Sequence, residues 1–275
     1  MSAQEKPLPR DIPFDLVEAL NVALDAVRAG CAVLAEGSLR LERLSRTTKS
    51  PGDISTEIDR SAESAILGRI RTKYPSHAVI GEESGASGDS PFRWIVDPLD
   101  GTMNYIRGLP YYAVSVALQA HETVVLGVVA DPVRGEFFTA IRGRGAYCNN
   151  QRIGVSQCQG LSDAVVGTVV PPPQWPGLNG YLGMFRDVAI RAAGVRRAGA
   201  AALDLAYVAA GRLDGFFVLS LKAWDISAGS LLVTEAGGAV ADIDGHPDPL
   251  KTNRLAAATP GVLPELLAVL RRASG

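Results

Sequence analysis

The sequence predicts an α/β fold of layered, alternating helices and sheets. Three observations predict it: helical spacing near the N-terminus, a series of β-type runs in the middle, and alternating helix and strand patterns in the second half. Elements in this order form layers around a common core. Of the 275 residues, 47% are hydrophobic and 20% are charged, which is ordinary for a chain that buries a large core.

The first half is expected to hold two helices and then a mostly antiparallel sheet. Residues 1–14 are polar and rich in proline and predict a flexible arm. Asp15 and Glu18 resemble a capping box for a helix that ends at Gly37. After a polar, partly basic connection, a second helix is expected from near Asp53 to Pro75. The predicted strands are Ala78–Gly81, Arg93–Asp97, Tyr111–Gln119, Thr123–Asp131 and Glu136–Ile141.

The second half alternates between helices and strands. The expected strands are Ala164–Val170, Asp214–Leu219 and Ala239–Ile243. The expected helices are Leu182–Ala193, Ala200–Ala210, Asp225–Ala236 and a last one from about Val262 to Arg272. We therefore expect one domain over residues 1–275, with an N-terminal half of about 15–145 and a C-terminal half of about 146–275.

Composition and charge exclude several classes of protein. The net charge of −2 gives no global basic field for nucleic acid or anionic lipid. The three cysteines have no C-x-x-C spacing, which argues against a zinc site or a disulfide framework. The N-terminus has no signal-peptide pattern, and polar residues interrupt the most apolar stretch, 111–129, so no membrane span is expected. These features predict a cytoplasmic protein.

Two aspartates follow the apolar run Trp94–Val96, where an α/β sheet usually places its ligands. Asp97 ends that run, and Asp100-Gly101 then turns the chain, so the two carboxylates can converge with the Leu99 carbonyl between them. Hard oxygen ligands of this kind suit Mg²⁺. The alternative interpretation is an ordinary turn in which the aspartates cap local backbone N–H groups.

Two further acidic motifs have both a structural and a functional interpretation. Glu82 and Glu83 lie between Gly81 and Gly85, where neighbouring carboxylates would repel each other unless a cation lay close by. The same residues also fit a solvated loop. Asp225 begins a predicted helix and needs no function as an N-cap, although a helix N-terminus also attracts phosphate.

The order of these motifs along the chain resembles the inositol monophosphatase family. The runs that carry the resemblance are G-E-E-S-G (81–85), W-I-V-D-P-L-D-G-T-M-N-Y (94–105) and W-D-I-S-A-G-S-L-L-V-T-E-A-G-G (224–238), with K-S-P-G-D-I-S-T-E-I-D-R (49–60) before them. The similarity spans about Asp15 to Arg272. It implies an αβαβα sandwich and the chemistry of the Mg²⁺-dependent, lithium-sensitive phosphatases of the fructose-1,6-bisphosphatase-like superfamily.

The resemblance also implies roles for individual residues. The implied metal ligands, for two or three Mg²⁺ ions, are Glu82, Asp97, the Leu99 carbonyl, Asp100 and Asp225. Asp59 and Thr102 would activate the attacking water, with Glu83 in the second layer around the metals. The implied substrate-binding positions are Leu99, Asp100, Gly101, Thr102, Gly199, Ala200, Ala201 and Asp225. Lys49 matches a lysine on a mobile loop near the weakest metal.

The expected substrate-ring contacts depart from the family pattern. Val218 stands seven residues before Asp225, where the family usually has a glutamate that binds sugar hydroxyls. Ala200 stands where the family often has Ser or Thr. Both replacements remove polar contacts, whereas the phosphate and metal positions show no departure. We therefore expect weak discrimination among phosphomonoesters, and a gain of activity toward inositol phosphate in Val218→Glu.

The implied function is hydrolysis of a small phosphorylated metabolite by direct attack of a metal-activated water. Inositol 1-phosphate is the leading candidate, and a sugar bisphosphate, 3′-phosphoadenosine 5′-phosphate and histidinol phosphate are the alternatives. The family also implies a homodimer.

A function of another class is a regulatory protein that binds the transcription machinery. Four basic residues would offer a surface for it: Arg40, Arg43, Arg46 and Lys49. A solvated loop explains the same residues. The intact set of expected metal ligands favours the enzyme.

Overall fold

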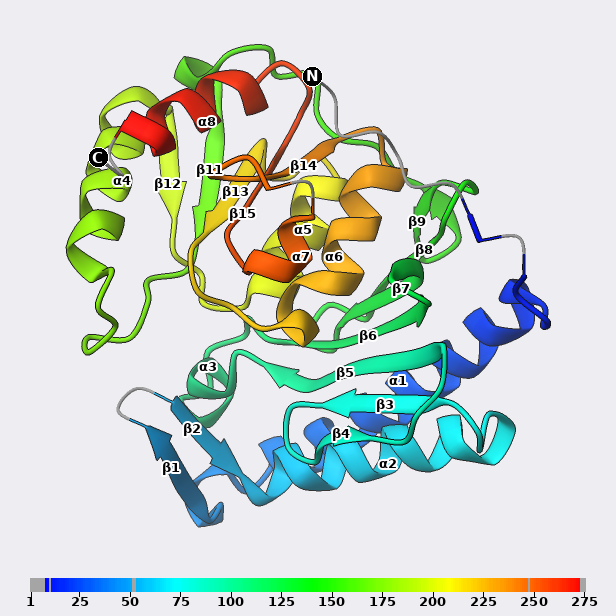
Figure 1. Ribbon diagram of the computed structural model, residues 1–275. Coiled ribbons are helices and arrows are strands. Elements are labelled where there is room, and N and C mark those ends of the chain that lie inside the picture. The colour runs from blue at the N-terminus through cyan, green and yellow to red at the C-terminus, as the bar shows by residue number, and fades with distance from the viewer. Residues whose placement is uncertain (1–7, 10, 51–52, 247, 273–275) are drawn as a thin grey trace.

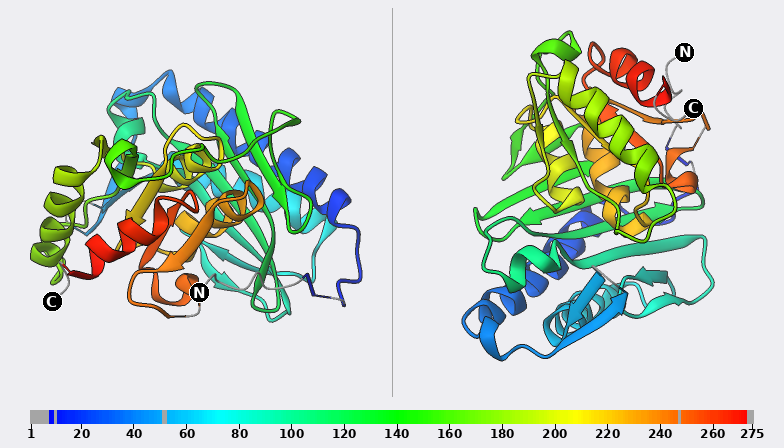
Figure 2. Two further views of the ribbon diagram at one scale, coloured as in Figure 1. Left: turned by 90° about the horizontal axis from the view of Figure 1, so that it is seen from above. Right: turned by 90° about the vertical axis from the view of Figure 1, so that its left-hand side faces the viewer.

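The computed structural model stacks helices and sheets in five layers (Figure 1). It describes residues 8–9, 11–50, 53–246 and 248–272, without the side chains of residues 43, 46, 48–50 and 53. An eight-stranded and a five-stranded sheet alternate with three pairs of helices, as the further views in Figure 2 also show. In layer order these pairs are α1 (Leu16–Ser38) with α2 (Glu57–Lys73), α5 (Ala201–Ala209) with α6 (Ala223–Glu235), and α4 (Leu178–Arg191) with α8 (Leu263–Arg272). The predicted αβαβα layering is confirmed.

The eight-stranded sheet has the strand order β10-β9-β8-β7-β6-β5-β3-β4. Only β3 and β5 pair in parallel, and all other neighbours are antiparallel. The strands are β3 (Ala78–Gly81), β4 (Gly85–Ser87), β5 (Phe92–Asp100), β6 (Ala113–Ala120), β7 (Thr123–Asp131), β8 (Glu136–Ile141), β9 (Ala146–Cys148) and β10 (Gln151–Arg152). The bounds predicted for β3, β7 and β8 are confirmed.

The five-stranded sheet has the strand order β12-β11-β13-β15-β14. Strand β11 is parallel to β12 and β13, whereas β15 is antiparallel to both of its neighbours. The strands are β11 (Val165–Thr168), β12 (Gly194–Arg196), β13 (Gly215–Val218), β14 (Ala239–Asp242) and β15 (Leu255–Ala258). Neither β12 nor β15 was predicted. The alanine-rich β15 has weak strand propensity, and its place between β13 and β14 makes it a strand.

The first two helices begin at side-chain caps. The Asp15 carboxylate accepts from the Val17 N–H at 2.9 Å, so Asp15 is the N-cap of α1. The reciprocal bond from Glu18 that would complete the predicted capping box is not among the contacts of the described residues. Helix α2 begins later than predicted, because residues 53–56 form strand β2 (Asp53–Thr56), which pairs with β1 (Arg46–Ser50). Thr56 is its N-cap, and Asp59 at the third helical position accepts from the Thr56 N–H.

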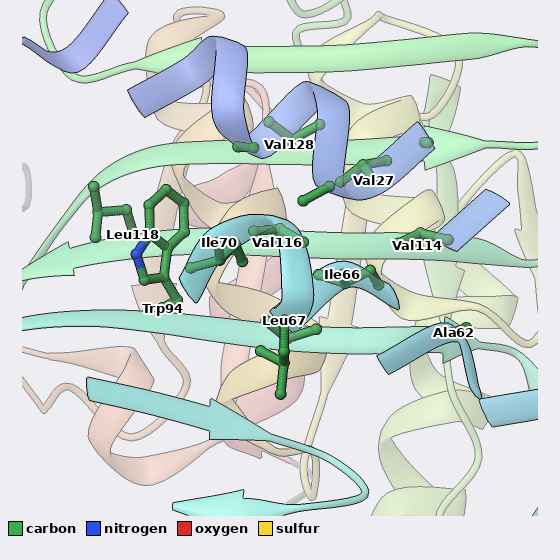
Figure 3. Close-up of a cluster of buried hydrophobic side chains, with 14 of the residues drawn as sticks. Val27, Ala62, Ile66, Leu67, Ile70, Trp94, Val114, Val116, Leu118 and Val128 are labelled. Carbon is green, nitrogen blue, oxygen red and sulfur yellow. The ribbon is translucent and has the colours of Figure 1, made fainter. Parts of the chain in front are cut away.

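The core between the first helical layer and the eight-stranded sheet is apolar throughout. Figure 3 shows Val27 of α1 and Ile66 of α2 facing Val116 and Val128 of the sheet, with Trp94 at one end. Burial of such side chains contributes roughly 1.5–3 kcal/mol each. This core holds β5 rigidly, and the candidate site lies at the end of β5.

The segment before α1 packs on the same core where it is described. The Phe14 ring lies 5.1 Å from the ring of Phe92, edge to face, and 5.1 Å from His77. The rest of the arm predicted over residues 1–14 lies partly outside the described residues. The division into two halves near residue 145 stays a prediction. None of the helices in the described part of the chain is long and apolar enough to cross a membrane.

Candidate active site

Two aspartates of the site come from the end of β5. Asp97 pairs with Ser115 of β6 and Asp100 with Ala113, so β5 has one extra residue between them. Residues three apart in a regular strand face opposite sides of the sheet, and one bulged residue brings both carboxylates to one side. The predicted end of this strand at Asp97 was therefore wrong: the strand continues through Pro98 as a bulge and ends at Asp100.

The third aspartate comes from the start of α6. Asp225 is not the N-cap, as its sequence position suggested, but the third residue of the helix, and its carboxylate accepts from the Lys222 N–H at 2.7 Å. Carboxylate oxygens of Asp97, Asp100 and Asp225 all lie within 4.8 Å of one another. The structure therefore brings these three predicted residues together from two different layers.

Burial makes these carboxylates costly to ionise. Burial raises the pKa of Asp97 well above its ordinary value, and the negative charges of Glu82, Asp100 and Asp225 raise it further. The pKa of Asp100 is raised by burial and then by Asp225. A divalent cation among these oxygens would favour the charged forms. The donor set, all carboxylate and carbonyl oxygen, fits Mg²⁺.

The turn that contains Glu82 rests on a residue that sequence reasoning missed. Glu63 of α2 is buried, and its carboxylate accepts from the N–H groups of Glu83 and Ser84, both at 2.9 Å. The Glu82 N–H donates to the Val96 carbonyl at 3.2 Å, next to Asp97. A usable signal was the position of Glu63 one helical turn after Asp59.

The two residues expected to activate water are in contact. Thr102 Oγ1 lies 3.0 Å from Asp59 Oδ1 and 3.1 Å from the Leu99 carbonyl oxygen, so its hydroxyl donates to either acceptor. Asp59 Oδ2 accepts from the N–H of Thr56 at 2.8 Å and from its hydroxyl at 2.6 Å. These bonds orient the Asp59 carboxylate toward Thr102, at the start of the short helix α3 (Thr102–Ile106).

The segment around Gly199 lies against the β5–α3 junction. A Cβ atom on Gly101 would lie 3.2 Å from the Gly199 carbonyl oxygen, and the φ angle of Gly101 is +94°. Both features require glycine there. The Ala202 N–H donates to Asp100 Oδ2 at 2.6 Å, and the Asn104 amide donates to the Ala198 carbonyl at 2.8 Å.

The side chains predicted to contact a substrate ring are buried in an apolar cluster. Ala200 and Ala201 belong to it together with Val218 and Ile226, and Val218 is only 1% exposed. Within this segment, Gly199 is only partly buried. The side chain of Lys49 lies outside the described part of the structure. A surface cavity of about 400 Å³ lies far from these residues, against α4 and α8, and holds none of them.

Another buried carboxyl lies on α5 beside the site, and sequence reasoning missed it too. Asp204 Oδ1 accepts from the Tyr111 hydroxyl at 2.5 Å, and its Oδ2 is buried without a partner in the described structure. Burial raises the pKa of Asp204 to about 7, although Tyr111 and Arg197 oppose the shift. Asp204 therefore changes protonation near neutral pH.

Residues 15–275 match the sequence model of the inositol monophosphatase family. The chain belongs to this family. It is 44% identical over 250 residues to Nus factor SuhB of Pasteurella multocida, covering 90% of this chain and 94% of that protein.

Solved structures of family members show the same fold. The extragenic suppressor protein suhB of Bartonella henselae superposes with a TM-score of 0.89 at 39% identity, covering 93% of this chain and 99% of the other. Inositol monophosphatase of Anabaena superposes with a TM-score of 0.82 at 32% identity, covering 94% and 97%. The resemblance expected from the three acidic motifs is thereby confirmed.

Proposed function

We propose that this family member is a Mg²⁺-dependent phosphomonoesterase that acts on a small phosphorylated metabolite. The observation that supports it is the convergence of three carboxyl groups, with the pKa of both Asp97 and Asp100 raised, beside the contact between Asp59 and Thr102. A structural role alone gives no reason to gather mutually repelling carboxylates in a buried place.

The residues that would hold the metal ions are those named by the family resemblance. They are Glu82, Asp97, the Leu99 carbonyl, Asp100 and Asp225. Bound Mg²⁺ supplies positive charge that neutralises the phosphate and lowers the pKa of a coordinated water. Asp100 is held by the Ala202 N–H and Asp225 by the Lys222 N–H, so both carboxylates keep their orientation before any ion binds.

Asp59 and Thr102 would orient and deprotonate the attacking water. The Thr102 hydroxyl donates to Asp59, which leaves lone pairs of Thr102 Oγ1 to accept from the water, and the proton passes through Thr102 to the Asp59 carboxylate. The N–H groups at the start of α3 have no partner within the helix and would donate to the phosphate oxygens. Glu83 would lie next to the metal ligands and contact a metal-bound water.

Inositol 1-phosphate remains the leading substrate candidate because of the family and its solved relatives. The apolar surroundings of Ala200 and Val218 offer no side-chain hydrogen bond to a sugar ring, which supports keeping the alternatives: a sugar bisphosphate, 3′-phosphoadenosine 5′-phosphate and histidinol phosphate. A phosphate-release assay over these four substrates, with Mg²⁺ and with EDTA, tests the proposal. Release from none of them with Mg²⁺ present would overturn the phosphatase assignment.

The same proposal includes three properties of the family. Li⁺ would inhibit by competing for a Mg²⁺ position, the protein would act in the cytoplasm, and it would form a homodimer. Inhibition assays with millimolar Li⁺ and light scattering of the purified protein test the first and the last.

A second function is favoured by the names of the relatives. Two relatives that are 44% identical to this chain are named Nus factor SuhB, and we propose contact with the transcription machinery as an additional role. Of the four basic residues expected to offer a surface for this contact, Arg40 is exposed. The side chains of Arg43, Arg46 and Lys49 lie outside the described part of the structure. Asp225→Asn separates the two roles: phosphatase activity should be lost and binding to purified transcription complexes retained.

A further inference from the structure

The side chain of Glu63 supports the turn that contains Glu82. This side chain is 3% exposed, and each of its two carboxylate oxygens accepts one backbone N–H, from Glu83 and from Ser84, at 2.9 Å. These two amides follow Glu82 directly. The turn between the paired residues Gly81 and Gly85 is thereby held by a side chain from a helix twenty residues earlier.

Gly81 on the other side of Glu82 is shaped by the same carboxylate. A Cβ atom on Gly81 would lie 2.5 Å from Glu63 Oε2 and 2.7 Å from its Cδ. Glycine is therefore required for the carboxylate to lie under the turn. Glu82 thus lies between Gly81, which leaves room for the Glu63 carboxylate, and Glu83, whose N–H donates to that carboxylate. The N–H of Glu82 itself is bonded to the Val96 carbonyl of β5.

Glu63 also connects this turn to the residue expected to accept the proton. Asp59 lies one turn earlier on α2 and contacts Thr102. The face of α2 that carries both carboxylates is buried, and Ala62 and Ile66 on this helix lie in the core. The positions of Glu82 and Asp59 are therefore set by one rigid element.

We propose that Glu63 is a positioning residue that holds Glu82 in place for metal binding and so sets the affinity of the site for Mg²⁺. The inference rests on the proposed function, because Glu82 matters here as a metal ligand. Without Glu63, the N–H groups of Glu83 and Ser84 lose their acceptor, and the turn is free to move. Loss of such an outer contact typically lowers metal affinity by about 10–100-fold.

The first test replaces Glu63 by glutamine and measures Mg²⁺ affinity by isothermal titration calorimetry. Glutamine keeps the size but presents an NH₂ group to one of the two N–H donors. We expect Mg²⁺ affinity to fall about 10–100-fold, with kcat at saturating Mg²⁺ near that of wild type. Glu57→Gln is the control, because Glu57 lies on the same helix and, among the described contacts, its side chain bonds only the exposed Ser45 hydroxyl.

The second test displaces the carboxylate without changing Glu63. In Gly81→Ala the new methyl group pushes the flexible end of Glu63 away from the turn, so the protein should fold and Mg²⁺ affinity should fall as in Glu63→Gln. Both changes break the same contact between the Glu63 carboxylate and the turn. The Mg²⁺ affinity of the double variant should therefore be no lower than that of the single variant with the lower affinity.

Three outcomes overturn the inference in different ways. Wild-type Mg²⁺ affinity in folded Glu63→Gln and Gly81→Ala would overturn it while leaving the proposed function intact. A kcat at saturating Mg²⁺ that falls as far as in Asp59→Asn would assign Glu63 to the chemical step instead of positioning. No Mg²⁺ binding by the wild-type protein would overturn the proposed function, and this inference with it.

Discussion

Asp97 and Asp100 are buried carboxyl groups whose surroundings favour the protonated form. Burial is the largest cause for both, and neighbouring carboxylates add to it. Asp97 accepts from the Leu99 N–H and Asp100 accepts from the Ala202 N–H, and these bonds favour the charged forms only in part. The ionised carboxylates repel one another when no cation is bound, and a bound cation would stabilise their charged forms.

We expect the metal-free protein to lose stability as the pH rises. The folded state raises the pKa of Asp97, Asp100 and Asp204 and so binds protons more tightly than the unfolded chain. The free energy of unfolding therefore falls as the pH rises above about 4, the ordinary carboxyl value. Thermal unfolding in EDTA between about pH 5 and about pH 8 measures it.

The variant Asp97→Asn should flatten that slope, because asparagine does not ionise and still accepts from the Leu99 N–H. The control is Asp25→Asn on α1, where the aspartate side chain is 60% exposed. A Tm in EDTA that rises across the same pH range would contradict the assignment of raised pKa values.

Asp225→Asn tests the metal site at one residue. Asparagine keeps the size and the bond from the Lys222 N–H but removes a negative charge. We expect a loss of kcat/KM of at least about 100-fold, about 2.7 kcal/mol, with an unchanged circular dichroism spectrum. Folded Asp225→Asn enzyme with near wild-type turnover would refute this metal assignment.

The secondary-structure elements place the reacting groups through their ends. Asp59 and Asp225 each occupy the third position of a helix. Each accepts from the N–H of the residue that precedes the helix, which is Thr56 for Asp59 and Lys222 for Asp225. The same bond that caps each helix fixes the direction of the carboxylate. Strand β5 adds its bulge, so one strand and two helix starts converge on the site.

Thr102→Val tests the contact between α2 and α3. Valine has the same shape as threonine but cannot bond Asp59 or the attacking water. We expect kcat to fall about 10²–10⁴-fold, while Mg²⁺ affinity measured by calorimetry stays the same. Thr72→Val on the exposed end of α2 is the matched control. An equal loss of Mg²⁺ affinity would show that Thr102 supports the metal site instead.

Val218→Glu tests how β13 is packed. The family pattern predicted a gain of inositol phosphate activity, but Val218 is buried in an apolar cluster with Leu255 opposite it on β15. An unpaired carboxylate there is costly to bury. We expect the free energy of unfolding to fall by several kcal/mol, measured by urea unfolding, with Val133→Glu at the exposed surface as control. An unchanged stability with a raised preference for inositol 1-phosphate would favour the pocket position.

The whole molecule is built so that the site lies between layers. Asp97 and Asp100 belong to the eight-stranded sheet, whereas Asp225 and the Ala202 N–H belong to the helices between the two sheets (Figure 1). An ion bound there would connect two layers that already meet through apolar packing and through hydrogen bonds such as that of Ala202 with Asp100. Metal binding is then expected to stabilise the entire fold and not one loop.

Mg²⁺ should therefore raise the global stability of the wild-type protein. At a free concentration of about 100 times Kd, binding adds about 2.7 kcal/mol to the free energy of unfolding. Urea unfolding with Mg²⁺ and with EDTA measures the difference, and Asp225→Asn should lose most of it. A Tm that is independent of Mg²⁺ up to millimolar concentrations would argue against a resident metal.

The sequence alone determined the layering, most long elements and the family. Strand β7 was predicted with its observed bounds, since an apolar run bounded by turn residues has few alternative structures. The acidic motifs also predicted which carboxylates to examine, because Asp97 and Asp100 are separated by only two residues and follow one apolar run.

Only the tertiary structure decided which of these residues meet, and what supports them. The contact of Glu63 with Ser84 spans 21 residues and that of Asp100 with Ala202 spans 102, and no local pattern encodes such distances. Strand β15 and the burial of Val218 were likewise decided by neighbouring strands. Local propensity is a preference of about 1 kcal/mol, whereas burial against distant elements contributes more and selects the final position.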